Sequence, residues 1–296
     1  MELNAQWIDS PPVAAATVMV LRDTADGLQV LMVRRHPNSP VLGGSWVFPG
    51  GKVGVADAAF PPDWCDLPAD AMQAALADAE LPLELARALH VAAIRETLEE
   101  CGLFIGGADN TPQTLAGFAA ALRAGSAIQA LLGGHRLALA TSSLVPWSRW
   151  ITPLRPSVTN KRFDTRFFVT QLPVDQLAVA DAHEVTEVLW TTPAQALTRY
   201  WSRDIDLAPP QIISLQQLAR FTSADAALRW GRGRPPATVL PESFDLDGRR
   251  VVCYPGDAGH SVKERAWDGP TRLTYVDGRF EPVDGLSGLL APGLAG

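Results

Sequence analysis

Cysteine, long apolar runs and an excess of basic residues are scarce or missing in this sequence of 296 residues. Its three cysteines, Cys65, Cys101 and Cys253, lie far apart and form no CxxC pair, which argues against a disulfide framework or a zinc site. No apolar run reaches the length of a membrane-spanning helix, and the first residues do not form the basic and apolar segments of a secretory signal. We therefore expect a soluble, cytoplasmic protein with no membrane partner.

The charge balance is acidic, with a net charge of -7 at pH 7 and a pI near 5.2. General nucleic-acid binders gain much of their affinity by neutralising phosphates with a basic surface, so we expect no nucleic-acid partner. Hydrophobic residues make up 47% of the chain, which is enough for one large core or two modest ones.

An acidic cluster is the most informative feature that the sequence does contain. Within a predicted helix from Leu83 to Cys101, Glu96, Glu99 and Glu100 are spaced i, i+3 and i+4, so their like charges crowd one face. Clustered carboxylates suit a hard cation such as Mg²⁺ or Mn²⁺. The alternative is a solvated acidic helix face with Arg95 as its salt-bridge partner.

A second segment, Trp46 to Val53, contains Phe-Pro-Gly-Gly and reads as a strand end that enters a tight turn. Together the two segments resemble the Nudix box, G-x5-E-x7-R-E-U-x-E-E-x-G-U, where U is a bulky apolar residue. The matching positions are Gly51, Arg95, Glu96, Glu99, Glu100, Gly102 and Leu103. Asp57 stands for the first glutamate, Thr97 for an apolar residue, and an insertion at 58–83 interrupts the box. Loops lengthen at small entropic cost, so the interruption is tolerated.

An interrupted box resembles the Nudix branch that includes peroxisomal coenzyme A diphosphatases and their bacterial relatives. Further similar segments extend the resemblance over roughly residues 12 to 220: Val30–Arg35, Gly44–Gly51, Arg162–Phe168 and Leu207–Gln211. A signature associated with coenzyme A recognition, LLTxR[SA]xxxRxxxGxxxFPGG, is partly present. Arg35 and the Phe-Pro-Gly-Gly run fit it, whereas His36 and Pro40 replace its small residue and its second arginine.

The resemblance implies an α/β (α+β) fold, the Nudix-type α-β-α sandwich, with a mixed sheet between helices. We expect a Nudix hydrolase domain over 10–230, which contains the insertion, and a C-terminal β-rich extension over 231–296 that packs on the core. The sequence pattern predicts strands at 14–22, 29–33, 137–150, 163–171 and 187–191, and in the extension at 251–254 and 273–276. It predicts further helices at 69–79, 114–122, 127–132, 193–200 and 210–222.

The same resemblance implies metal-dependent hydrolysis of a diphosphate linkage in a nucleoside diphosphate joined to another moiety. The substrate is expected to be a small nucleotide-type molecule, most of all coenzyme A or an acyl-coenzyme A. Two alternatives stay open: a diphosphatase for ADP-ribose or NADH-type dinucleotides, and a non-catalytic, ligand-sensing Nudix domain. A structural protein with an acidic helix would leave the glycine turn unexplained. A homodimer is possible.

Individual site residues follow from the resemblance and from side-chain chemistry. The metal, Mg²⁺ or Mn²⁺, is expected on Glu96, Glu99, Glu100 and the Gly51 carbonyl, with Arg95 orienting the glutamates. The general base is Glu96, Glu184 or Glu187, although either of the last two can equally be a surface salt-bridge partner. Candidates for substrate contacts are Arg34, Arg35, Lys161 and Arg166 for phosphates, and Phe48 for stacking; each of them also has an ordinary structural explanation.

Overall fold

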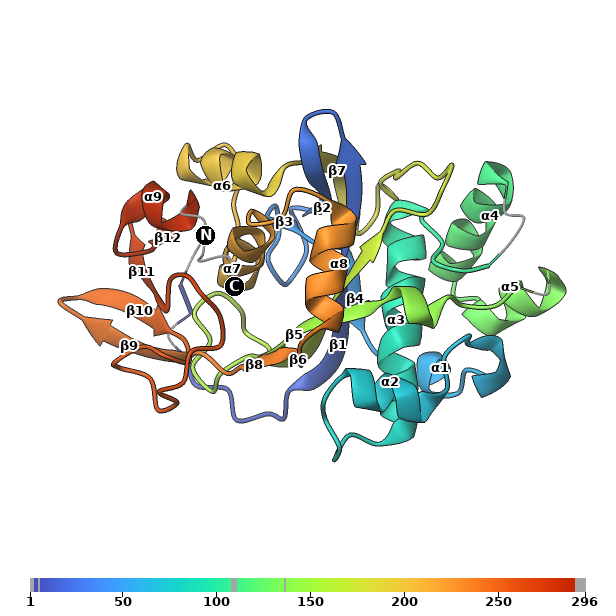
Figure 1. Cartoon of the computed structure of the whole chain (residues 1–296), viewed down its shortest axis with the longest axis horizontal. Helices are drawn as coiled ribbons and strands as arrows, with labels where there is room; N and C mark the ends of the chain where they lie inside the picture. Colours follow the sequence, from blue (N-terminus) through green and yellow to red (C-terminus); the bar gives the residue numbers. More distant parts are fainter. Residues whose placement is uncertain (1–2, 5, 108–110, 136, 291–296) are drawn as a thin grey trace.

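A mixed β-sheet forms the centre of the computed structural model, which describes all residues except 1–2, 5, 108–110, 136 and 291–296 (Figure 1). Its strands are β1 (Val13–Thr24), β2 (Gly27–Arg35), β3 (Trp46–Val47), β4 (Gly50–Lys52), β5 (Val145–Ile151), β6 (Phe163–Gln171), β7 (Val185–Thr191) and β8 (Ala237–Val239). They run in the order β3-β2-β1-β6-β5-β8, while β4 pairs with β1 and β7 with β2. Strand β1 pairs with β6 in parallel and with β2 and β4 in antiparallel fashion.

The period of two in the strands separates two apolar cores. In β1, Val18 and Val20 belong to one core, whereas Met19 and Leu21 belong to the other. Both faces of the sheet are therefore covered, and the strand reads as a nearly continuous apolar run.

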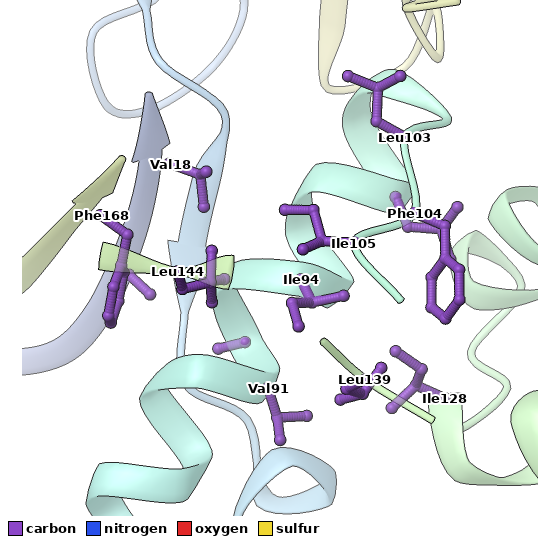
Figure 2. Packing of buried hydrophobic residues seen from close by; sticks show 14 of the residues in the cluster. Val18, Val91, Ile94, Leu103, Phe104, Ile105, Ile128, Leu139, Leu144 and Phe168 are labelled. Carbon is purple, nitrogen blue, oxygen red and sulfur yellow. The ribbon is translucent and has the colours of Figure 1, made fainter. Parts of the chain in front are cut away.

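One core lies between the sheet and a group of helices around the long helix α3 (Leu83–Cys101). Figure 2 shows Val91 and Ile94 of α3 in this core, with Val18 and Phe168 from the sheet. The other helical segments on this side are α1 (Val55–Ala58), the 3-10 turns Pro62–Trp64 and Thr141–Ser143, α2 (Ala69–Ala75), α4 (Pro112–Arg123) and α5 (Ile128–His135). None of the described helices is both long and apolar enough to cross a membrane.

The opposite face carries helices α6 (Pro193–Trp201), α7 (Pro209–Leu218) and α8 (Ala224–Arg232), followed by a second sheet (Figure 1). This antiparallel sheet contains β9 (Glu242–Leu246), β10 (Arg249–Cys253), β11 (Arg272–Val276) and β12 (Arg279–Glu281), and α9 (Gly285–Leu290) follows it. Tyr254, Trp267 and Phe280 share the core of Trp150. The hydroxyl of Tyr200 also donates to the Phe280 carbonyl at 3.0 Å, which joins the extension to α6.

The predicted α-β-α sandwich and the β-rich tail are present, but several local predictions were wrong. Gly50 and Gly51 lie in strand β4 instead of a tight turn, and the expected strand at 137–150 begins only at Val145. Helix α2 ends at Ala75, and α8 was not predicted. Strand β8, which lies within the predicted extension, pairs with β5 in the main sheet. The proposed division at residue 231 stays a prediction.

His90 gives α3 a measurable acid sensitivity. The ring is fully buried, its Nδ1 contacts the Ala86 carbonyl at 2.8 Å, and burial lowers its pKa to about 4 from an ordinary 6.5. The unfolded chain binds the proton first as the pH falls, so stability that is complete above pH 6.5 is lost progressively towards pH 4. We expect a loss of about 2 kcal/mol at pH 5 from this group.

A His90→Leu variant should lack this part of the acid sensitivity, because leucine has no proton to bind. Urea unfolding of both proteins at pH 7.5 and pH 5 measures the difference. An equal loss of stability in the two proteins between these pH values would contradict the assignment.

Candidate active site

Helix α3 presents the acidic cluster to the glycine strand β4. The helix ends at Gly102, whose left-handed backbone (φ 67°) allows the Gly102 N–H to donate to the Leu98 carbonyl. Thr97, which replaces an apolar residue of the Nudix pattern, is fully buried, and its hydroxyl donates to the Ala93 carbonyl at 2.8 Å. The substitution therefore leaves no unsatisfied hydroxyl in the core.

Two of the three glutamates reach the backbone of β4. The Glu100 carboxylate accepts a hydrogen bond from the Gly50 N–H at 2.9 Å and is 2% exposed. Glu96 lies so close to Gly51 that a Cβ at that position would be 2.3 Å from its Oε1. A residue with a side chain at Gly51 would therefore displace the Glu96 carboxylate from its present position.

Arg95 connects the carboxylates to one another. Its Nη1 lies 2.9 Å from Glu96 Oε1 and 2.8 Å from Glu99 Oε2, and its Nη2 donates to the Lys52 carbonyl at 3.0 Å. Burial alone would lower the pKa of this guanidinium, but its bonds to Asp57 and the nearby glutamates hold that pKa above its ordinary value. Arg95 is therefore a fixed cation that sets the orientation of Glu96 and Glu99.

Asp57 is the anchor of Arg95. Its carboxylate accepts from Arg95 Nε at 2.8 Å and from Nη2 at 2.9 Å, and it also accepts from the Gly54 N–H at 2.7 Å. The side chain is fully buried at the start of α1. The sequence indicated Asp57 by its place in the motif, but only the fold shows that it bonds the arginine on the far side of the insertion.

The cluster carries more negative charge than its protein partners balance. Burial raises the pKa of Glu96 to about 7, the pKa of Glu99 is raised by burial, and burial together with Glu96 raises that of Glu100 well above its ordinary range. Glu100 Oε1 is buried and has no hydrogen-bond partner among the described residues, and the nearest cation, Arg35 Nη1, is 4.0 Å away.

This donor set fits a hard divalent cation. The donors are all oxygens, and one of them, Glu100 Oε1, has no hydrogen-bond partner within the described part of the chain. The backbone of the glycine strand β4, with its carbonyl groups, lies alongside. Arg95 draws Glu96 and Glu99 towards its own guanidinium, and in the described part of the chain no three acidic, histidine or cysteine side chains already surround a common point.

Glu184 and Glu187 differ in their surroundings. The charge of Glu184 contributes to the raised pKa of Glu96, Glu99 and Glu100, so it lies near all three, and its side chain is exposed. Glu187 instead pairs with Arg34 at 2.7 Å on the surface of the β2–β7 pair. The sequence left open that Glu187 is a surface salt-bridge partner, and its pairing with Arg34 is such a salt bridge.

Arg166 bonds two aspartates and none of the three glutamates, and its contact with substrate phosphate stays a prediction. The side chain is 3% exposed, and its guanidinium bonds Asp164 at 2.7 Å and Asp78 at 2.6 Å. Arg149 bonds the same two aspartates. Since Asp78 belongs to the insertion, these arginines attach the insertion to β5 and β6.

A cavity of about 320 Å³ begins at β4, on the sheet face opposite α3. Arg35, Gly50, Gly51 and Lys52 line it. The first three lie next to Glu96 or Glu100, and the Lys52 carbonyl accepts a hydrogen bond from Arg95. Lys161 also lies on its wall and is exposed. Phe48 lines the cavity but is 2% exposed and packs its ring edge-to-face with Phe167 at 6.5 Å, so it is mainly a core residue.

Comparison with known proteins gives consistent matches. Residues 71–218 match the family model described as the NUDT19 Nudix domain. The chain is 29% identical over 275 residues to the acyl-coenzyme A diphosphatase NUDT19 of Gallus gallus, covering 77% of this chain and 72% of that protein. The corresponding protein of Xenopus laevis is 27% identical over 317 residues, with 85% and 81% covered. A crystal structure of a Nudix hydrolase from Alicyclobacillus acidocaldarius shares the fold, with a TM-score of 0.58, 28% identity, and 77% and 99% covered.

Proposed function

This chain belongs to the NUDT19 Nudix family and is a Nudix hydrolase, and we propose that it cleaves the diphosphate linkage of coenzyme A or an acyl-coenzyme A. One observation carries the proposal: the glycine strand β4 is shared by the acidic cluster and by a cavity large enough for part of a coenzyme. A diphosphate at the cluster would therefore have one of its two substituents at the mouth of that cavity.

The residues at the site have separate roles in the proposed reaction. Glu96, Glu99, Glu100 and the Gly51 carbonyl would hold Mg²⁺ or Mn²⁺, which when bound supplies positive charge at the diphosphate. Arg95 is a positioning residue, since its guanidinium is already engaged by carboxylates. Arg35 lies between Glu100 and the cavity and is suited to donate to phosphate oxygens.

We propose Glu184 as the residue that accepts the proton of the attacking water. It is exposed and it lies near the three glutamates, and among the described residues no arginine pairs with its side chain as Arg95 pairs with Glu96 and Glu99. Glu187 is less suited, because Arg34 pairs with its carboxylate.

The test is a mass-resolved assay of the purified protein with Mg²⁺ and with Mn²⁺. Coenzyme A should yield 3',5'-ADP and 4'-phosphopantetheine. Excess EDTA should abolish turnover, because the three glutamates repel the negatively charged diphosphate unless a cation lies between them. ADP-ribose and NADH serve as comparison substrates. Preferred cleavage of either one would replace the coenzyme A assignment, and no cleavage of any compound would favour a ligand-sensing domain. The cytoplasmic location and the homodimer stay predictions.

A further inference from the structure

The cavity beside β4 has walls from three separate parts of the chain. Strands β1 and β6 form one side with Thr17 and Thr165, and the first turn of α7 forms another with Pro210 and Gln211. The C-terminal sheet closes the third side with Ser243 and Val252. A substituent of the diphosphate that extends into this cavity therefore contacts the C-terminal extension.

Most aromatic rings at the cavity are not free to sandwich a nucleobase. Trp150 packs against Phe167, Tyr254 and Trp267 with centroid separations of 5.7 to 6.3 Å. Phe48 and Phe167 pack edge-to-face on each other. These rings are engaged within the core, and apart from the half-buried Phe163 and the basic residues Arg35, Lys52 and Lys161, the remaining wall consists largely of prolines, aliphatic groups and hydroxyls. Such a lining suits a flexible, mostly apolar chain better than a flat base that needs an open ring face.

Gln211 supplies the polar group that such a chain would need. The residue is 6% exposed, lines the cavity, and its Oε1 is buried with no hydrogen-bond partner among the described residues. An unpaired buried amide costs free energy unless a ligand satisfies it. A side-chain amide offers both a donor and an acceptor, so its natural partner is another amide.

We propose that this cavity binds the pantetheine arm of the substrate, with Gln211 hydrogen-bonded to one of its amide groups. The arm is neutral, extended and mostly apolar, and it carries two amides, which matches both the wall and the orphaned amide. The assignment rests on the proposed function, because it takes coenzyme A as the substrate. It leaves the adenosine 3',5'-bisphosphate half outside the cavity.

Titration calorimetry with the two halves of the substrate tests this placement on the full chain in the presence of Mg²⁺. Gln211→Leu should weaken the binding of 4'-phosphopantetheine about tenfold, as expected for one lost hydrogen bond in a buried site. The same variant should bind adenosine 3',5'-bisphosphate within about twofold of the wild-type affinity. A loss for the bisphosphate alone, an equal loss for both halves, or no loss for either would overturn the proposal.

A second variant covers the case in which Gln211→Leu does not fold. Ser243→Phe, on the half-buried wall strand β9, should narrow the cavity and weaken 4'-phosphopantetheine by a similar factor, whereas Ser287→Phe on the exposed surface of α9 should not. Equal binding by these two variants would again overturn the assignment. Because binding is measured without turnover, a wild-type protein that binds 4'-phosphopantetheine but fails to cleave coenzyme A would contradict the proposed function and leave the cavity assignment intact.

Discussion

Glu100→Gln should lower kcat on coenzyme A on the order of 10²- to 10³-fold while leaving the fold intact. The amide keeps an oxygen for the Gly50 N–H but loses the negative charge that the proposed cation needs. Removing a buried charge also removes its desolvation cost, so the variant in EDTA should be at least as stable as the wild type. Steady-state kinetics with Mn²⁺ and thermal unfolding with and without Mn²⁺ measure both effects.

The unfolding measurement separates a lost metal ligand from a damaged fold. Mn²⁺ should raise the Tm of the wild type, because a ligand that binds only the native state stabilises it, and this increase should be small or absent in Glu100→Gln. Glu84→Gln is the matched control, since Glu84 is exposed in the first turn of the same helix. Wild-type kcat together with an unchanged Mn²⁺ effect in Glu100→Gln would refute the site.

Asp57→Ala should destabilise the protein by about 3–5 kcal/mol, the usual cost of removing one partner from a buried ion pair. The change removes both hydrogen bonds to Arg95 and leaves the Gly54 N–H without its acceptor. Glu96 and Glu99 would then follow a displaced guanidinium, so kcat should fall as well. Urea unfolding gives the free energy, and kinetics on the folded fraction give kcat.

The charge of Asp57 can be distinguished from its shape. Asp57→Asn keeps an oxygen that accepts a hydrogen bond and should lose less stability than Asp57→Ala. Asp70→Ala removes an exposed aspartate from the first turn of α2 and should change the free energy of unfolding by about 0.5 kcal/mol or less. An Asp57→Ala protein as stable as Asp70→Ala would show that the Arg95 pair does not hold this site together.

Local periodicity predicted the parts of the fold that depend on neighbouring residues. The helix from Leu83 to Cys101 has the predicted bounds, and Gly102 ends it in the left-handed conformation. Strand β6 also has its predicted bounds, Phe163–Gln171. Segments with weaker patterns were less accurate: the start of β5 was misplaced, and α8 was overlooked.

Sequence reasoning did not foresee side chains that are paired across a long separation in the chain. Arg166 lies in a segment that is similar to the Nudix branch, yet its guanidinium forms a salt bridge with Asp78 of the insertion. Gln211 was noted only as part of a similar segment, and its role in the cavity had no signal besides its place after two prolines at a helix start. Burial and partner choice at such positions are properties of the folded chain.

The sequence by itself determined that three carboxylates share one face of a helix, because the period of the α-helix brings i, i+3 and i+4 together wherever that helix lies. Only the tertiary structure decided that Asp57 holds Arg95 and that the C-terminal sheet closes the cavity at Ser243. The physical reason is that closing a long loop costs little more entropy than closing a short one. Sequence distance therefore does not indicate which distant segments come into contact. The packing of the two cores on the sheet determines these contacts.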